Sequence, residues 1–171
     1  IESGTKRIIG HLFAHYERYY DDAKWHFWRR TKTKTKVILI DKNKYYVFYD
    51  GECGFCNFWV QWILNNDKKD QFLFAALQSD FGQKFLKERG LKSDDFDTIY
   101  LWKPDAFYLT KSDAILKIAN TIGGIYNLAT ILKIFPKFSR DIGYNLIAKN
   151  RKKLMEQECL LPTPEQRKKF V

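Results

Sequence analysis

The feature that most constrains this chain is a pair of cysteines, Cys53 and Cys56, placed between a strand-like run and a helical pattern. The residues before them, YYVFY at 45–49, are mostly aromatic and β-branched, which is typical of a strand. The residues after them keep an apolar helical spacing to about residue 66. Such a pair could be a redox centre, half of a metal site, or two buried thiols that happen to be close.

The chain continues to alternate strands and helices after this junction. Chain order predicts strands at 37–40, 45–49 and 71–77, a helix at 79–90 with Ser79 as its N-cap, a hairpin from 97–102 and 106–110, and helices at 111–124, 125–135 and 137–154. The order β-α-β-α-β-β-α from residue 44 to about 123 predicts an α/β fold with the thioredoxin arrangement. The cysteine pair then lies at a strand-to-helix corner of a central sheet.

The apolar helix at 125–135 is hydrophobic nearly all round. We expect it to be buried among the C-terminal helices, with a groove for a partner as the alternative.

The spacing of the cysteines suits thiol–disulfide exchange. A helix that begins at Cys53 places its sulfur at the positive end of the helix dipole, which stabilises a reactive thiolate. Cys56 lies about one turn later on the same face, where it can attack a mixed disulfide formed at Cys53. Gly54 permits close approach of a substrate chain, and Phe55 offers an apolar surface beside the sulfurs.

A metal site needs two more ligands than the pair supplies. The other candidates are Cys159 and three histidines, His11, His15 and His26, all distant in sequence. We therefore expect no metal here, and interpret the histidines as surface or interface residues.

The composition of the chain excludes several classes of protein. Three cysteines are too few for a disulfide scaffold, and the first residues lack the apolar core of a signal peptide, so we expect a reducing compartment, cytoplasmic or organellar (mitochondrial) matrix. No apolar run reaches the length of a membrane span. No glycine motif for a nucleotide is present, so we expect no cofactor, with electrons arriving from another protein or a small thiol.

The basic excess is confined to the two ends of the chain. Residues 1–43 and 137–171 each carry a net charge of +5, and residues 44–136 are neutral. Basic ends of this kind solubilise a domain, or bind RNA, an anionic membrane surface or an acidic partner.

Longer stretches resemble a known family. The segment YDGECGFC at 49–56 resembles the signature of the DCC family of thiol–disulfide oxidoreductases. The helix KSDAILKIANTIGG, the segment FPKFSRDIGYNLIAKNR at 135–151 and the tail CLLPTPEQRKKF at 159–170 are similar to further family segments. The resemblance covers about residues 44–171 and implies a thioredoxin-like fold with dithiol–disulfide function.

Carried over by position, the family's motif residues are Asp50, Cys53 and Cys56. Asp50 could orient the loop by accepting backbone N–H bonds, move protons during exchange, or act only as a cap. Two positions depart from ordinary thioredoxins. Val47 replaces their buried aspartate, and Thr98 falls where their cis-proline presents its backbone to a substrate.

The remaining features are Cys159 and the first 43 residues. We expect Cys159 to be a packed, inert thiol, with a redox partner of the site as the alternative. Residues 1–43 form an aromatic, basic extension with a predicted amphipathic helix, outside a domain at 44–171.

The sequence thus predicts a thiol–disulfide oxidoreductase that exchanges a Cys53–Cys56 dithiol or disulfide with a protein thiol/disulfide partner or a glutathione-like thiol. The competing hypothesis is a thioredoxin-like structural subunit of a larger, organellar or RNA-containing assembly, docked through its basic termini.

Overall fold

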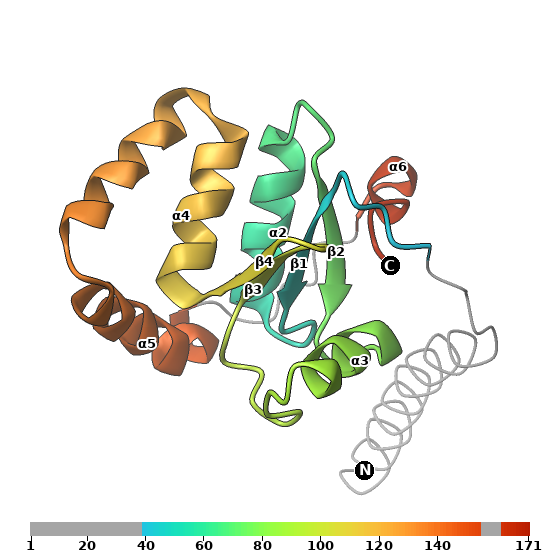
Figure 1. Ribbon diagram of the computed structural model, residues 1–171, viewed down its shortest axis with the longest axis horizontal. Helices are drawn as coiled ribbons and strands as arrows, with labels where there is room; N and C mark the ends of the chain where they lie inside the picture. The colour runs from blue at the N-terminus through green and yellow to red at the C-terminus, as the bar shows by residue number, and fades with distance from the viewer. Residues whose placement is uncertain (1–38, 155–161) are drawn as a thin grey trace, which may run out of the picture. The chain divides into compact units, whose positions relative to one another are not determined.

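The strands and helices follow the order β-α-β-α-β-β-α that the sequence predicts. The computed structural model describes residues 39–154 and 162–171 (Figure 1). Their elements are β1 (Tyr45–Tyr49), α2 (Gly54–Asn66), β2 (Phe72–Ala76), α3 (Asp80–Glu88), β3 (Tyr100–Lys103), β4 (Phe107–Thr110), α4 (Lys111–Ile122), the 3₁₀ helix η1 (Gly124–Ile134), α5 (Lys137–Leu154) and α6 (Pro164–Arg167). The α/β prediction is confirmed, and the arrangement is consistent with a thioredoxin-like fold.

The strands of the described residues form one mixed sheet in the order β2-β1-β3-β4. β1 and β2 run parallel, with Val47 beside Phe74, and α2 connects them, because a tight hairpin cannot join parallel neighbours. β3 runs antiparallel to β1, with Val47 beside Leu101, and β4 pairs antiparallel with β3. β1 is therefore a central strand, and the cysteine turn follows directly from its end.

Side chains of β1 alternate between two apolar layers. Val47 and Tyr49 pack in a cluster with residues of α2 and α4, whereas Tyr46 and Phe48 pack in a cluster with residues of α3. Figure 1 shows α2 and α4 on one side of the sheet and α3 on the other. Fully burying each such side chain contributes about 1.5–3 kcal/mol. The start of the cysteine turn is thus held firmly in place.

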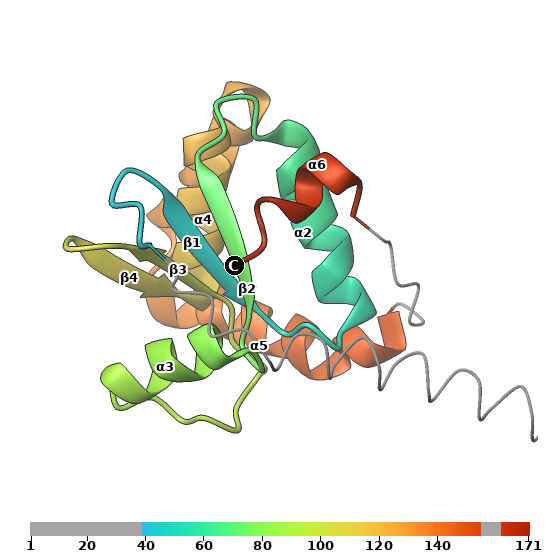
Figure 2. The same cartoon turned by 90° about the vertical axis from the view of Figure 1, so that its right-hand side faces the viewer.

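The end of the chain covers the outer edge of β2. The Phe74 amide donates to the Lys169 carbonyl oxygen at 2.8 Å, and the Val171 amide donates to the Phe74 carbonyl oxygen at 3.0 Å. Figure 2 shows α6 and the C-terminus beside this strand. The contact matters because an uncovered strand edge can pair with the strands of other chains.

The apolar segment after α4 differs from the expectation. η1 has no buried residue, and Ile125 and Ile134 are 73% and 81% exposed. Its inner side contacts α4, and within the described residues its outer side is uncovered. The prediction of full burial is wrong. A helix that is hydrophobic nearly all round can be buried, but burial also requires another element to cover its outer side.

The strand expected at 37–40 is absent where it can be examined. Leu39 and Ile40 belong to no strand, and Leu39 is 87% exposed. Residues 1–38 lie outside the described residues, so the extension at 1–43 and its helix stay predictions. From Ile40 onward the described residues belong to one compact unit.

Gly82 lets α3 rest directly on the end of β2. A Cβ atom added at Gly82 would lie 2.7 Å from the Leu77 carbonyl oxygen, and closer still to the Ala76 carbonyl oxygen. Both are backbone atoms, so no flexible side chain could move aside. The Gly82 amide also donates to the Ser79 hydroxyl, the N-cap of α3, at 3.1 Å.

We expect Gly82→Ala to lower the free energy of unfolding by about 1–3 kcal/mol, because the overlap outweighs the gain in helix propensity. Gly143→Ala is the matched control. Its Cβ would meet nothing within 4 Å, so it should raise the free energy of unfolding by about 0.5–1 kcal/mol. Urea denaturation measures both. A Gly82→Ala protein as stable as the wild type would contradict this packing.

Candidate functional site

The two cysteines lie where β1 ends and α2 begins. The Cys53 amide donates to the Asp50 carbonyl oxygen at 3.3 Å, which closes the turn. Cys53 is the N-cap of α2, and its sulfur accepts a hydrogen bond from the Cys56 amide at 3.4 Å. The first amides of a helix lack partners within it and form the positive end of its dipole. The Cys53 sulfur is therefore placed where negative charge is stabilised.

The two thiols have different surroundings. Both are free, but Cys53 is only 3% exposed, whereas Cys56 is partly exposed and lines a cavity. Burial raises the pKa of the Cys56 thiol, and its hydrogen bond with Cys53 and the charges of Cys53 and Asp50 raise it further, against the opposing effect of Arg151. Cys56 therefore keeps its proton at neutral pH.

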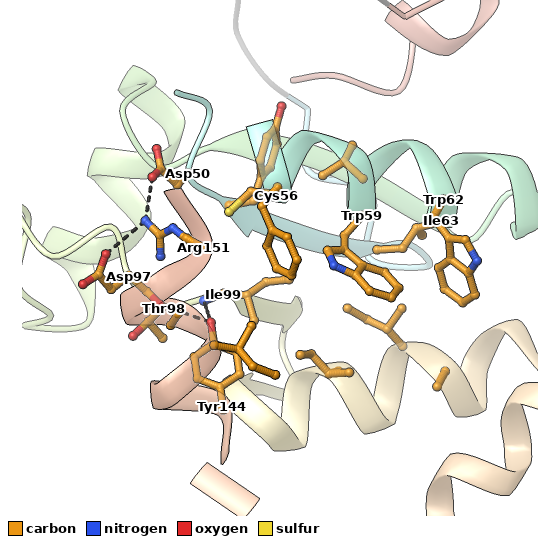
Figure 3. A pocket seen from close by; sticks show the side chains of 18 of the residues that line it. Asp50, Cys56, Trp59, Trp62, Ile63, Asp97, Thr98, Ile99, Tyr144 and Arg151 are labelled. Carbon is orange, nitrogen blue, oxygen red and sulfur yellow. Dashed lines mark hydrogen bonds and ion pairs between the residues drawn. The ribbon is translucent and has the colours of Figure 1, made fainter. Parts of the chain in front are cut away.

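The cavity beside Cys56 has a volume of about 610 Å³ and is lined mainly by aliphatic and aromatic side chains (Figure 3). Its walls come from α2, α4, η1, α5 and the segment before β3. Figure 3 shows the aromatic side chains of α2 running along it away from the cysteine. The polar groups gather at the cysteine end: Asp50, Asp97, Thr98, Tyr144 and Arg151.

The predicted substrate-binding residues fall on this cavity or beside it. Phe55 lines the cavity and packs edge-to-face against Trp59, with ring centroids 6.2 Å apart. Thr98 also lines it, nearly buried, just before β3. Gly54 is the first residue of α2 and is not part of the lining. The structure thus brings Phe55 and Thr98 together with Cys56.

The Asp50 carboxylate accepts three hydrogen bonds. Its Oδ1 accepts hydrogen bonds from the Glu52 amide at 3.1 Å and from Gln78 Nε2 at 2.6 Å, and its Oδ2 accepts one from Arg151 at 2.6 Å. The Glu52 bond is the backbone contact that the loop-orienting hypothesis requires. The carboxylate therefore fixes the turn between β1 and α2.

Arg151 is a site residue that the sequence reasoning missed. Its Nη2 lies 2.6 Å from Asp50 and 3.0 Å from Asp97, and donates to the Phe96 carbonyl oxygen at 3.3 Å. Its side chain is 5% exposed, so this is a buried ion pair. The signal was its place in GYNLIAKNR, a segment similar to the family, although nothing in that pattern names Asp50 as its partner.

Tyr144, also on α5, fixes the segment before β3. Its hydroxyl accepts from the Ile99 amide at 3.0 Å and donates to the Asp97 carbonyl oxygen at 3.2 Å. Burial raises the pKa of Tyr144 to about 12, so it stays neutral at physiological pH. Two residues of α5, Tyr144 and Arg151, thus position the segment that carries Thr98.

Other expectations concern residues beyond the site. Among residues 39–154 and 162–171, no group of three or more His, Cys, Asp or Glu side chains is arranged to hold a metal ion. In the same part of the chain no helix is long and apolar enough to cross a bilayer. Cys159 and the three histidines lie outside the described residues, so their roles stay predictions.

The buried ion pair generates a stability prediction. Arg151→Met leaves the Asp50 carboxylate buried without its cation, and we expect a loss of about 3–5 kcal/mol in the free energy of unfolding. Lys42→Met is the control, because Lys42 and Asp105 are also 2.6 Å apart but are exposed, and their loss should leave the urea midpoint unchanged. Equal effects of the two variants would contradict the buried pair.

Comparison with known proteins identifies the family of the chain. A family model described as DCC1-like thiol-disulfide oxidoreductase matches residues 47–157. The uncharacterized protein YuxK of Bacillus subtilis is 38% identical over 127 residues, which cover 73% of this chain and 92% of YuxK. A chloroplastic DCC family protein of Arabidopsis thaliana is 37% identical over 119 residues, which cover 69% of each chain.

No solved structure gives a significant match to the chain. The family match, residues 47–157, includes the cysteine turn, the residues that line the cavity and Arg151. The resemblance found in the sequence is thereby confirmed. The chain belongs to the DCC1-like thiol-disulfide oxidoreductase family.

Proposed function

We propose that the chain exchanges a dithiol and a disulfide at Cys53 and Cys56 with thiol or disulfide partners. One observation carries this proposal: the Cys53 sulfur caps the N-terminus of α2 and lies 3.4 Å from the Cys56 amide. Membership of the family supports a general thiol–disulfide oxidoreductase role.

The exchange takes two steps. The Cys53 thiolate attacks one sulfur of a partner disulfide, so that a bond to Cys53 forms, the partner's S–S bond breaks and one partner thiolate leaves. Cys56 then loses its proton and attacks the Cys53 sulfur, which forms the Cys53–Cys56 disulfide and releases the second partner thiolate. The same steps in reverse oxidise a partner dithiol and reduce the pair.

The neighbours of the pair have separate roles in this proposal. Burial and Cys53 raise the pKa of Cys56 most; Arg151 lowers it and Asp50 raises it by smaller amounts, so both residues adjust the second step. Asp50 acts as a positioning residue through the turn that it holds. Because Cys53 is 3% exposed, a partner reaches it after a local opening of the turn, where Gly54 offers no side chain to block the approach.

The partners and the compartment that we propose are those that suit this chemistry. A protein thiol or a glutathione-like thiol can serve in either direction, and a reducing compartment would regenerate the dithiol. The Arabidopsis relative is named chloroplastic; for this chain we propose a reducing cytoplasm or organellar matrix. The alternative, a structural subunit docked through basic termini, gains no support from the described residues.

Trapping of the mixed disulfide tests the proposal. We expect Cys56→Ser, combined with Cys159→Ser, to hold glutathione on Cys53 after reaction with glutathione disulfide, because the resolving thiol is gone. Peptide mass spectrometry locates the adduct. The matched control, Cys53→Ser with Cys159→Ser, should form it far more slowly, because Cys56 keeps its proton.

The release step of the same reaction should depend on pH. A raised pKa means that the reactive Cys56 thiolate becomes more abundant as pH rises. Glutathione release from Cys53, in protein that retains Cys56, should therefore keep accelerating past about pH 8.5, where an ordinary cysteine titrates. Stopped-flow mixing follows the release. A rate that levels off near neutral pH, or an adduct found only on Cys56, would contradict the assigned order of attack.

A further inference from the structure

The cavity beside Cys56 has the size and the lining of a small-molecule site. Its volume is about 610 Å³, and pockets for small ligands are about 300–1,000 Å³, mostly apolar, with a few polar groups at fixed places. Trp62 and Tyr126 form part of the wall, edge-to-face with centroids 4.7 Å apart. Exchange with a protein thiol does not need a cavity of this size.

The polar end of the cavity carries an unused hydrogen-bond donor. Arg151 is 4% exposed, and within the described residues its buried Nε has no hydrogen-bond partner. Figure 3 shows Arg151 at the same end as Cys56. An N–H without an acceptor is unfavourable, and because this Nε is itself buried, a ligand oxygen would reach it only after a shift of the Arg151 side chain.

The charges at that end favour a neutral oxygen. The guanidinium of Arg151 already has two carboxylates beside it, Asp50 at 2.6 Å and Asp97 at 3.0 Å. A carboxylate or phosphate ligand would meet two negative charges and only one positive, and would lose its hydration against an apolar wall. The carbonyl oxygen of an uncharged molecule accepts a hydrogen bond without either cost.

The apolar wall continues to the surface. Ile125 of η1 and Ile147 of α5 both line the cavity, and they are 73% and 49% exposed. Leu128 and Ile131 of η1 are exposed as well. A long apolar chain that leaves the cavity on this side would meet exposed apolar side chains, and burying its CH₂ groups against them favours binding.

We propose that the cavity binds a quinone with an apolar side chain, which oxidises the Cys53–Cys56 dithiol. An uncharged carbonyl compound with an apolar body fits the charges and the walls, and a quinone is the class of such compounds that accepts two electrons from a dithiol. The inference rests on the proposed function. It names the oxidant of the same site, and it places that oxidant at the Cys56 side rather than at the covered Cys53.

The redox step balances with these reactants. The S–H bond of Cys56 breaks, and one S–S bond forms between its sulfur and the Cys53 thiolate. The two electrons pass to the quinone ring, and the Cys56 proton and one proton from solvent end on its carbonyl oxygens to give the hydroquinone. Arg151 lies at this end of the cavity, and its positive charge would stabilise the negative charge that develops on the nearer carbonyl oxygen.

The test uses the full chain, reduced and kept free of oxygen, with Cys159→Ser so that only the pair reacts. The probe is a benzoquinone with all four ring positions substituted, one by a decyl chain, because a ring hydrogen would let thiols add to the ring. Absorbance follows hydroquinone formation. Mass spectrometry after alkylation counts the remaining thiols and would reveal any adduct.

Variants locate the reaction in the cavity. Ala129→Trp and Ala148→Trp each fill part of it, because both alanines line the wall. Ala106→Trp adds the same side chain at the exposed β3–β4 turn, outside the lining. Each protein is also oxidised with glutathione disulfide, which reports the folded state and the reactivity of the pair independently of the quinone.

The expected result is one hydroquinone per disulfide at a rate that saturates with quinone. The second-order rate constant at low quinone concentration should fall about tenfold or more in at least one filled variant that still reacts with glutathione disulfide, and be unchanged in Ala106→Trp. A rate that never saturates, or one equal in filled and control variants, overturns the quinone proposal.

The two proposals can fail separately. If glutathione disulfide oxidises the pair and the quinone does not, the proposed function stands and the quinone inference is overturned. If neither oxidant forms the Cys53–Cys56 disulfide, both are overturned.

Discussion

The buried ion pair between Asp50 and Arg151 is the contact on which the site depends. It joins the turn before α2 to the C-terminal part of α5, across 101 positions of sequence. A buried pair repays its loss of hydration only when its remaining groups are also satisfied. Here Glu52 and Gln78 complete the shell of Asp50, and Asp97 and the Phe96 carbonyl bind Nη2 of Arg151, while its buried Nε has no partner among the described residues. Through these contacts the pair fixes the cysteine turn, closes one end of the cavity and holds the segment before β3.

The buried carboxylate near the cysteines lies at a different position from that of ordinary thioredoxins. In this chain Val47 occupies the position of the buried aspartate of thioredoxins, and it is fully buried in the apolar layer under α2 and α4. A buried carboxylate still lies near the cysteines, but it is Asp50, on the turn itself and paired with a cation. Burial and Cys53 raise the pKa of Cys56 most, and the guanidinium of Arg151 and the carboxylate of Asp50 add smaller, opposed effects. Changes at α5, far away in sequence, can then tune the reactivity of the pair.

The sequence correctly predicts those parts of the structure that depend on short, local patterns. The strand-to-helix junction at Cys53, the Ser79 cap and the hairpin at 97–110 follow from short patterns whose physics acts within a few residues. Arg151 did not follow, because its partner is set by how α5 packs and not by its neighbours in sequence. The burial of 125–135 was wrong for a related reason: hydrophobicity does not say whether another layer exists to cover a helix.

The most direct test of this account is the equilibrium titration of the pair in glutathione redox buffers, with free thiols trapped by an alkylating reagent and counted by mass. Protein with Cys159→Ala should lose two thiols together in one two-electron transition, and Cys53→Ala should abolish that transition. Arg151→Met, where it folds, should move the midpoint, because it removes the cation that opposes Asp50. Thiols that stay reduced throughout, or that titrate one at a time, would contradict the claim that Cys53 and Cys56 form a redox pair.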